Sequence, residues 1–240
     1  ARVVGKSSAR KNLRRPGKNA PASETPVRKV FFAAALKKKT PGIRDSCRMG
    51  VQTHYVEPGA TVAVIGCGGI GLSTINGAAI AGASRIIAVD MVASKLELAR
   101  KFGATDVVDA SDGDAVAKVK ELTGGGVHYS FEAIGLKVCA EQAFQMLRIG
   151  GTATVIGMIP PGDMVSLRGV DFLSEKKIQG SFMGSNRFRV DMPRFIEFYL
   201  QGRLHLDDLI SQKIKLGDIN EGMAALNTGE IARSVIMFDS

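Results

Sequence analysis

Short apolar runs alternate with longer amphipathic stretches from about residue 58 to the end of the chain. The apolar runs predict strands at residues 61–65, 85–89, 106–108, 127–131, 152–156 and 177–183, with a closing strand at 234–238. The amphipathic stretches predict helices at residues 69–81, 93–102, 114–123, 138–147, 192–201 and 219–226. Strands that alternate with helices of this length indicate parallel β-α-β units. We therefore expect the α/β fold class, a doubly wound parallel sheet of the Rossmann type with helices on both faces.

The first predicted strand runs directly into a glycine-rich turn, and the first predicted helix follows at once. The turn consists of Gly66, Cys67, Gly68, Gly69, Ile70 and Gly71. In this setting Gly66 permits a tight turn, Gly68 leaves the main chain open to a pyrophosphate, and Gly71 lets the helix lie close to the sheet. The helix N-terminus adds free N–H groups and a partial positive charge. The alternative is a turn whose glycines serve tight packing alone.

Asp90 ends the second predicted strand, 24 positions after Gly66. A carboxylate at this place accepts hydrogen bonds from the adenosine ribose and repels a 2′-phosphate, so the pattern favours NAD over NADP. Lys95 would add a second ribose contact. The alternatives are that Asp90 caps the next helix and that Lys95 is a solvated helix residue.

Other polar groups give weaker signals. Cys67 is either a thiolate activated by the helix N-terminus or, as we favour, a small side chain that fits beneath a cofactor. Glu132 ends the fourth predicted strand, where α/β sheets place ligands. It is either a catalytic base or a structural carboxylate, and we favour the second. The histidines, His54, His128 and His205, are too scattered to suggest a metal site.

The first 50 residues differ in composition from the rest of the chain. The whole chain has 240 residues and a formal charge of +9, yet residues 1–50 hold 14 Lys or Arg against 2 acidic residues, and four of the eight prolines. This composition favours disorder. We therefore divide the chain into an irregular basic segment, residues 1–50, and an NAD-binding Rossmann domain, residues 51–240. Nucleic-acid binding by the basic segment is disfavoured, because it has no reader motif and little aromatic interleaving.

Several classes of protein are excluded by the pattern. No run of 18 apolar residues occurs, so no membrane-spanning helix is predicted. Cys47, Cys67 and Cys139 include no CxxC pair, which excludes a disulfide framework and a thiolate zinc cluster. The first ten residues do not have the pattern of a signal peptide. We expect a reduced, cytoplasmic setting.

Taken in order, these motifs resemble the cofactor domain of the zinc-dependent, medium-chain alcohol dehydrogenases. The branch is the one that oxidises primary alcohols or hydroxymethyl-thiol adducts with NAD. The resemblance runs from about Val56 to Phe238. The segments that carry it are VEPG at 56–59, GCGGIG at 66–71, IAVD at 87–90, KFGATD at 101–106, FEAIG at 131–135, TVIGM at 154–158 and GEIARS at 229–234.

The resemblance implies NAD as the cofactor and a small alcohol as the substrate. It assigns the pyrophosphate to the glycine turn and to Arg233, with Ile70 reaching toward the nicotinamide, and the adenosine ribose to Asp90 and Lys95. The remaining implied contacts lie beside the cofactor or at its nicotinamide end: Ile134, Ile156, Gly157, Met158, Ser181, Phe182 and Met183. A homodimer is also implied, through a strand near residues 164–183 that pairs across a two-fold axis.

The chain departs from that family in its first 50 residues. The family's catalytic domain binds zinc through a Cys, a His-Glu pair and a second Cys, and residues 1–50 match no part of it; Met49 stands where the last thiolate is expected. We therefore predict no catalytic and no metal-binding residue in this chain, and NAD binding with little or no alcohol oxidation by the chain alone. An upstream truncation or frameshift is our hypothesis for this start.

Two other functions stay open at this point. The first is a non-catalytic NAD-binding or dimerisation module, which would bind cofactor without turnover. The second is an S-adenosylmethionine-dependent methyltransferase, which also uses a glycine-rich turn and a ribose-binding acid. The length of the resemblance beyond residue 130 disfavours the methyltransferase.

Overall fold

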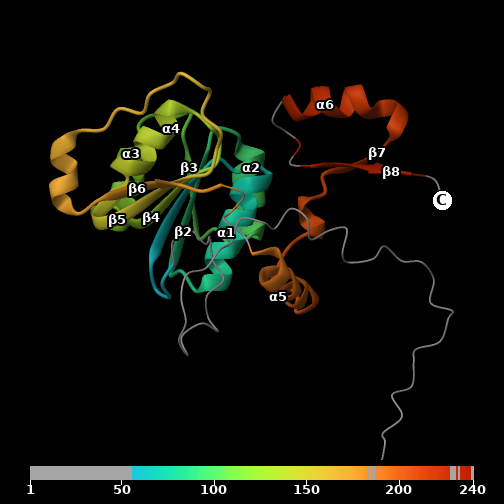
Figure 1. Ribbon diagram of the computed structural model, residues 1–240, viewed down its shortest axis with the longest axis horizontal. Helices are drawn as coiled ribbons and strands as arrows, with labels where there is room; N and C mark the ends of the chain where they lie inside the picture. Colours follow the sequence, from blue (N-terminus) through green and yellow to red (C-terminus); the bar gives the residue numbers. More distant parts are fainter. Residues whose placement is uncertain (1–55, 183, 185–186, 228–230, 232, 239–240) are drawn as a thin grey trace, which may run out of the picture.

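A computed structural model describes residues 56–238 except 183, 185–186, 228–230 and 232 (Figure 1). Its main feature is a six-stranded parallel sheet in the order β3-β2-β1-β4-β5-β6. The strands are β1 (Thr61–Ile65), β2 (Arg85–Asp90), β3 (Asp106–Asp109), β4 (Val127–Glu132), β5 (Leu147–Val155) and β6 (Lys177–Gly180). The strand order reverses between β1 and β4, so the crevice at the carboxyl ends of these two strands is a switch point where such sheets bind ligands.

Helices cover both faces of this sheet. They are α1 (Gly69–Ala81), α2 (Ala93–Lys101), α3 (Ala115–Thr123), α4 (Lys137–Gln145) and α5 (Phe188–Leu200). Along β1, Val62 and Val64 pack into the core with α1, α2 and α5, whereas Ala63 and Ile65 pack into the core with α3 and α4. Because both faces are buried, the strand is apolar at each position from Val62 to Ile65 rather than alternating. The predicted doubly wound α/β fold is confirmed.

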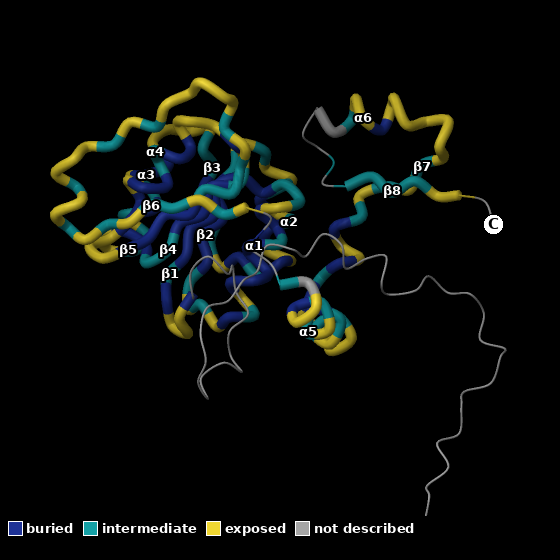
Figure 2. The backbone as a smooth tube through the Cα atoms, viewed as in Figure 1, coloured by how far each residue is buried: buried dark blue, intermediate teal, exposed yellow. Residues whose placement is uncertain are grey.

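The burial pattern follows the same layers. Figure 2 shows the central strands buried, and the connection from β5 to β6 exposed along most of its length. That connection contains the 3₁₀ helix η4 (Gly169–Ser174), in which Leu173 is 85% exposed. The core therefore lies under α1 to α5, and the edge of the sheet at β6 is thinly covered.

A second, smaller sheet follows α5. It pairs β7 (Gln212–Lys215) in parallel with β8 (Ser234–Met237), and α6 (Ile219–Asn227) connects them. Two short 3₁₀ helices, η6 (Asp207–Leu209) and η7 (Leu216–Asp218), flank β7. Figure 1 shows this unit to one side of the six-stranded sheet. The closing strand predicted at 234–238 therefore pairs with β7, a strand that the sequence pattern did not predict.

Asn76 fixes the segment after α5 to α1. Its side chain is buried, accepts a hydrogen bond from the main-chain N–H of His205 at 3.0 Å and donates to the carbonyl of Arg203 at 3.2 Å. The guanidinium of Arg203 lies over the ring of Phe198, 4.7 Å from its centroid. The chain is thus held against the sheet before it enters the small sheet.

Some predictions lie outside the described residues. These are the basic segment at residues 1–50, with its boundary at residue 51, and also Cys47, His54 and Met183. Within the described ranges, no helix is both long and apolar enough to cross a membrane.

Candidate functional site

The glycine turn after β1 has the geometry that close approach of a phosphate requires. Gly66 has a φ of +93°, and its N–H donates to the carbonyl of Val89 at 2.8 Å. A Cβ on Gly71 would lie 1.7 Å from the carbonyl oxygen of Gly66, so only glycine lets α1 start this close to the strand. Gly68 is the N-cap of α1, where no side chain caps the helix, and a Cβ there would meet nothing within 4 Å. The main chain at the start of α1 therefore borders open space.

Asp90, at the end of β2, is hydrogen-bonded to the glycine turn. Its Oδ2 accepts from the main-chain N–H of Cys67 at 2.7 Å, and its Oδ1 accepts from the N–H of Val92 at 3.0 Å. The side chain is partly exposed. Each carboxylate oxygen can accept a second hydrogen bond, so Asp90 has capacity for two hydroxyl groups beside the open space. Val92 is the N-cap of α2, whose first turn has no side-chain cap, so the bond from Val92 to Asp90 does not give Asp90 the helix-capping role that was the alternative.

Cys67 is buried beneath this turn. Its Sγ lies 3.9 Å from the carbonyl oxygen of Val89. Burial, and then the negative charge of Asp90, raise the pKa of the thiol to about 12, although the positive charge of Lys95 opposes this. A protonated, inaccessible thiol is a poor nucleophile. The structure therefore favours a small packing side chain over a reactive thiolate.

Glu132, at the end of β4, is also buried, and it joins two turns. One carboxylate oxygen accepts from the N–H groups of Ile134 and Gly135 at 2.8 and 2.6 Å, and the other from the N–H of Gly157 at 3.2 Å. With no exposed surface, the carboxylate cannot reach a substrate proton. The structure favours the structural role over that of a catalytic base.

Two isoleucines lie at the mouth of the crevice. Ile134 follows β4 and Ile70 lies in the first turn of α1, and both are 49% exposed. A Cβ on Gly66 would lie 2.5 Å from Cγ1 of Ile134, which shows that this side chain lies directly against the glycine turn. The structure thus brings Ile134 together with the glycine turn, and its cofactor contact stays a prediction.

The next predicted contacts follow β5 and β6. The N–H of Ile156 donates to the carbonyl of Glu132 at 2.8 Å, and the N–H of Ser181 donates to that of Val155 at 2.9 Å. Met158 and Phe182 are 90% and 84% exposed. Since the strands are parallel, all of these residues lie at the same edge of the sheet as the glycine turn. Their predicted cofactor contacts are compatible with this placement.

Three further predicted residues are Lys95, Arg233 and Met183. Lys95 is in the first turn of α2, near enough to Cys67 and Asp90 to affect the thiol electrostatically. Arg233 belongs to the small sheet, where its carbonyl accepts from the N–H of Ser211 at 2.9 Å, and burial lowers the pKa of its guanidinium. Met183 lies among the undescribed residues.

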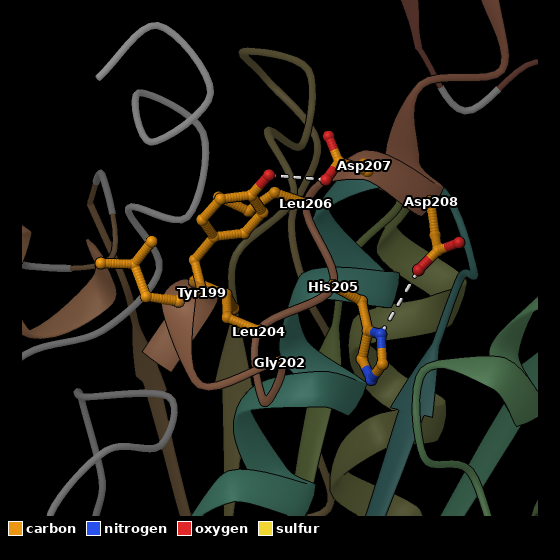
Figure 3. A pocket seen from close by; sticks show the side chains of 8 residues that line it. Tyr199, Gly202, Leu204, His205, Leu206, Asp207 and Asp208 are labelled. Carbon is orange, nitrogen blue, oxygen red and sulfur yellow. Dashed lines mark hydrogen bonds and ion pairs between the residues drawn. The ribbon is translucent and has the colours of Figure 1, made fainter. Parts of the chain in front are cut away.

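A pocket near the end of α5 is distinct from the crevice (Figure 3). In it Tyr199 donates to Asp207 at 2.6 Å, and His205 pairs with Asp208 at 3.3 Å. The pocket is lined by Tyr199, Leu200, Gly202, Leu204, His205, Leu206, Asp207 and Asp208. None of these residues was predicted to contact a cofactor. We therefore place the candidate cofactor site at the glycine turn, on the strength of its chemistry.

The described residues do not fit a zinc ion. Among residues 56–238, apart from the gaps given above, no three His, Cys, Asp or Glu side chains lie close enough together to hold a metal. Cys67 and Cys139 are free and buried, and burial raises the pKa of both thiols, which disfavours the thiolate form that zinc requires.

The chain is similar to known dehydrogenases over most of its length. The sequence model of the family described as zinc-binding dehydrogenase matches residues 69–201. The "Probable S-(hydroxymethyl)glutathione dehydrogenase 1" of Schizosaccharomyces pombe is 38% identical over 191 residues, which cover 78% of this chain and 50% of that protein. The chain therefore spans about half the length of this relative. The match does not favour the methyltransferase alternative.

Solved structures agree with the sequence matches. Benzyl alcohol dehydrogenase from Acinetobacter calcoaceticus has a TM-score of 0.76 and 30% identity, covering 88% of this chain and 54% of that one. A chain assigned as a zinc-binding dehydrogenase from Sinorhizobium meliloti, solved with NADP, has a TM-score of 0.64 and 29% identity, covering 77% and 52%. The chain therefore belongs to the zinc-dependent, medium-chain alcohol dehydrogenase family, of which it contains the cofactor-binding part.

Proposed function

We propose that the chain binds NAD in the crevice between the turns that follow β1 and β4. The observation that carries this proposal is the hydrogen bond from the N–H of Cys67 to Asp90, which fixes a carboxylate beside the uncapped start of α1. A pyrophosphate would lie against the main chain of the glycine turn, and the adenosine ribose against Asp90 and Lys95. Gly68 supports this, because the space that its missing Cβ leaves is open.

The nicotinamide would lie toward the ends of β4, β5 and β6. Ile134 and Ile70 offer apolar surface there, and the main chain of Ile156, Gly157 and Met158 offers polar groups. We keep Ser181, Phe182, Met183 and Arg233 as further proposed contacts. When bound, NAD supplies the acceptor for a hydride; the residues of this chain would bind it, orient it and shield one side of its ring.

Asp90 is the reason for proposing NAD rather than NADP. A 2′-phosphate on the adenosine ribose would place negative charge beside this carboxylate, which already accepts two main-chain hydrogen bonds. The relative from Sinorhizobium meliloti was solved with NADP, so the preference has to be argued from Asp90 and cannot be taken from the family.

We further propose that this part serves the oxidation of a primary alcohol or a hydroxymethyl-thiol adduct, as the names of the relatives suggest. The described residues offer no zinc site. Removal of the alcohol proton needs a Lewis acid such as zinc, or an equivalent group, that lowers the pKa of the alcohol. We therefore expect cofactor binding with little or no turnover by this chain alone. The reducing cytoplasm is the proposed setting, in keeping with the free thiols of Cys67 and Cys139.

A binding experiment separates this proposal from the alternatives. NADH fluorescence is titrated with the purified chain, and NADPH and S-adenosylmethionine are then tested as competitors. The proposal predicts saturable NADH binding, weaker competition by NADPH and none by S-adenosylmethionine. Displacement by S-adenosylmethionine would instead support a methyltransferase. An assay with primary alcohols, zinc and the remainder of such an enzyme then separates the dehydrogenase part, which should support turnover, from a non-catalytic module, which should not.

We also propose a homodimer formed through the edge of the six-stranded sheet. β6 is the last strand in the order and has a partner on one side in the described part of the chain. Next to it, η4 exposes Val170 and Leu173, at 64% and 85%. An open strand edge beside apolar surface favours pairing with a second copy across a two-fold axis.

A further inference from the structure

Glu132 is a buried negative charge that the proposed hydride chemistry does not use. Its side chain has 0% exposure, and no basic side chain within the described ranges forms an ion pair with it. Three main-chain N–H groups stabilise it instead, at 2.6 to 3.2 Å. An ionised carboxylate away from water is costly unless such donors surround it. The burial of this carboxylate among three main-chain donors therefore points to a structural role for it.

The donors come from two turns that follow neighbouring strands. Gly135 and Ile134 belong to the turn after β4, and Gly157 belongs to the turn after β5, 25 residues from Glu132. The carbonyl of Glu132 also accepts from the N–H groups of Ile156 and Gly157 at 2.8 and 3.2 Å. Side chain and main chain of one residue thus hold the second turn against the first.

The two turns contact each other main chain to main chain. A Cβ on Gly157 would lie 2.1 Å from the nitrogen of Gly135 and 2.6 Å from Oε2 of Glu132. A Cβ on Gly135 would lie 2.7 Å from the carbonyl oxygen of Met158. No side chain fits between these turns, and the carboxylate of Glu132 is hydrogen-bonded to both of them.

A carboxylate is suited to this place because both of its oxygens only accept hydrogen bonds. Both turns present donors to it. A glutamine of the same shape would offer one acceptor and one NH₂ group, so an N–H would face an N–H at one of the turns. The charge at position 132 therefore satisfies two sets of donors at once, a task that the neutral analogue cannot perform.

We propose that Glu132 is a positioning residue for the nicotinamide end of the cofactor: its carboxylate holds the turns at residues 133–135 and 156–158 at a fixed separation. This rests on the proposed function, since these turns are the proposed contacts of the nicotinamide. The glycine turn and Asp90 are joined to each other by a separate hydrogen bond. The two halves of the cofactor are therefore held by two separate sets of contacts.

The test uses two ligands that share one half. NADH carries the nicotinamide, whereas ADP-ribose carries the adenosine and the pyrophosphate without it. For Glu132→Gln we expect NADH affinity to fall about tenfold, because one charge-assisted hydrogen bond is lost, while ADP-ribose affinity stays within about twofold. The control is Glu121→Gln, because Glu121 is an exposed carboxylate at the end of α3. This variant should change neither the NADH affinity nor the ADP-ribose affinity. Equal weakening of both ligands by a folded Glu132→Gln variant would overturn the inference.

A second measurement uses the unmodified chain and decides the matter if the variant does not fold. Amide hydrogen exchange is followed with NADH and with ADP-ribose. NADH, and not ADP-ribose, should slow exchange at residues 133–135 and 156–158. Equal effects of the two ligands at these turns would contradict the positioning role and leave NAD binding intact. Failure of the wild-type chain to bind either ligand would overturn the proposed function, and this inference with it.

Discussion

The main-chain N–H of Cys67 donates to Oδ2 of Asp90 at 2.7 Å. This bond joins the glycine turn after β1 to the end of β2, so the surface for a pyrophosphate and the surface for a ribose have a fixed relation. Neither residue achieves this alone, because the turn supplies the donor and the strand end supplies the acceptor. The predictions below follow from this arrangement and from the contacts around it.

The glycine turn predicts different results for two Gly-to-Ala changes. A Cβ at position 71 would lie 1.7 Å from the carbonyl oxygen of Gly66, so Gly71→Ala should lower both the free energy of unfolding, by about 1–3 kcal/mol, and NADH affinity. A Cβ at position 68 meets nothing within 4 Å. Gly68→Ala should cost at most about 1 kcal/mol of stability yet lower NADH affinity about tenfold, because it fills the space of the pyrophosphate.

Urea denaturation and NADH titration of the two variants measure these effects. Gly217→Ala serves as the control, since a Cβ there also meets nothing within 4 Å and the position is remote from the turn. If Gly68→Ala binds NADH as tightly as the wild type, the pyrophosphate does not lie where we place it.

The thiols in the core should resist alkylation. Burial, together with nearby carboxylates, raises the pKa of the Cys67 thiol to about 12 and that of the Cys139 thiol to about 11. Treatment with iodoacetamide at about pH 8 should therefore leave both cysteines unmodified in the folded chain and modify both in urea. Mass spectrometry of the peptides gives the answer. Fast labelling of Cys67 without denaturant would restore the reactive-thiolate interpretation.

Arg85 and Asp106 form an ion pair that should make stability depend on pH. The guanidinium donates twice to the carboxylate, at 2.8 and 2.7 Å. Mainly through these bonds, Arg85 lowers the pKa of Asp106 from 3.8 to about 2. The folded state then binds this proton less tightly than the unfolded state, so the stabilisation is complete above about pH 4 and is lost as the pH falls toward about 2.

Asp106→Asn should therefore be less stable than the wild type at neutral pH, and the difference should shrink in acid. Urea midpoints at roughly pH 7, 5 and 3 would show it. Asp112→Asn is the matched control, because Asp112 is 93% exposed and its contact with Lys118 is 3.6 Å long. A difference that stays constant over this range would show that the pair does not titrate as described.

The proposed dimer predicts a response to charge at the sheet edge. Leu173→Glu places a carboxylate in the exposed apolar surface of η4, where Leu173 is 85% exposed. Because the Leu173 side chain itself is largely exposed, the fold should persist while dimers dissociate into monomers. Sedimentation velocity measures the outcome. Leu200→Glu, at the end of α5 and 69% exposed, is the control; dissociation by both variants, or by neither, would count against the edge of β6.

Much of the fold could be predicted because local pattern and burial agree. β1 and α1 begin and end where the sequence predicts, since a strand buried on both faces is continuously apolar and Gly82 ends the helix. α5 begins at Phe188 rather than at 192, because Asp191 caps it by accepting from the N–H of Arg187 at 2.8 Å. That bond is not visible in the apolar pattern, which predicts a start at 192.

Strands with few apolar residues were harder to predict. β7 has the sequence QKIK and alternates between half-buried and exposed positions, so its only signal is Ile214. β5 begins at Leu147, before Gly150 and Gly151, because a register shift opposite Val127 lets the strand continue past the glycines. In both cases the partner strand, which is distant in sequence, decides the outcome.

The candidate site also has parts that the sequence predicts and parts that it does not. Glycine spacing and the strand-end acid identify the turn and Asp90, since each is a local signal. The bonds that connect them could not be predicted, because Cys67 and Asp90 are 23 residues apart and Glu132 and Gly157 are 25 apart. The FEAIG segment was a signal for Glu132, but it contains nothing that identifies the second turn.

The most direct test of the account is a titration of NADH with the wild-type chain and with Asp90→Ala. The control is Asp109→Ala, because Asp109 ends β3 in register with Asp90 and accepts hydrogen bonds from Ser111. We predict that Asp90→Ala lowers NADH affinity about tenfold or more while the control stays within about twofold. Equal NADH affinity of the wild type and Asp90→Ala, with both folded, would contradict the central claim that this carboxylate and the glycine turn form the cofactor site.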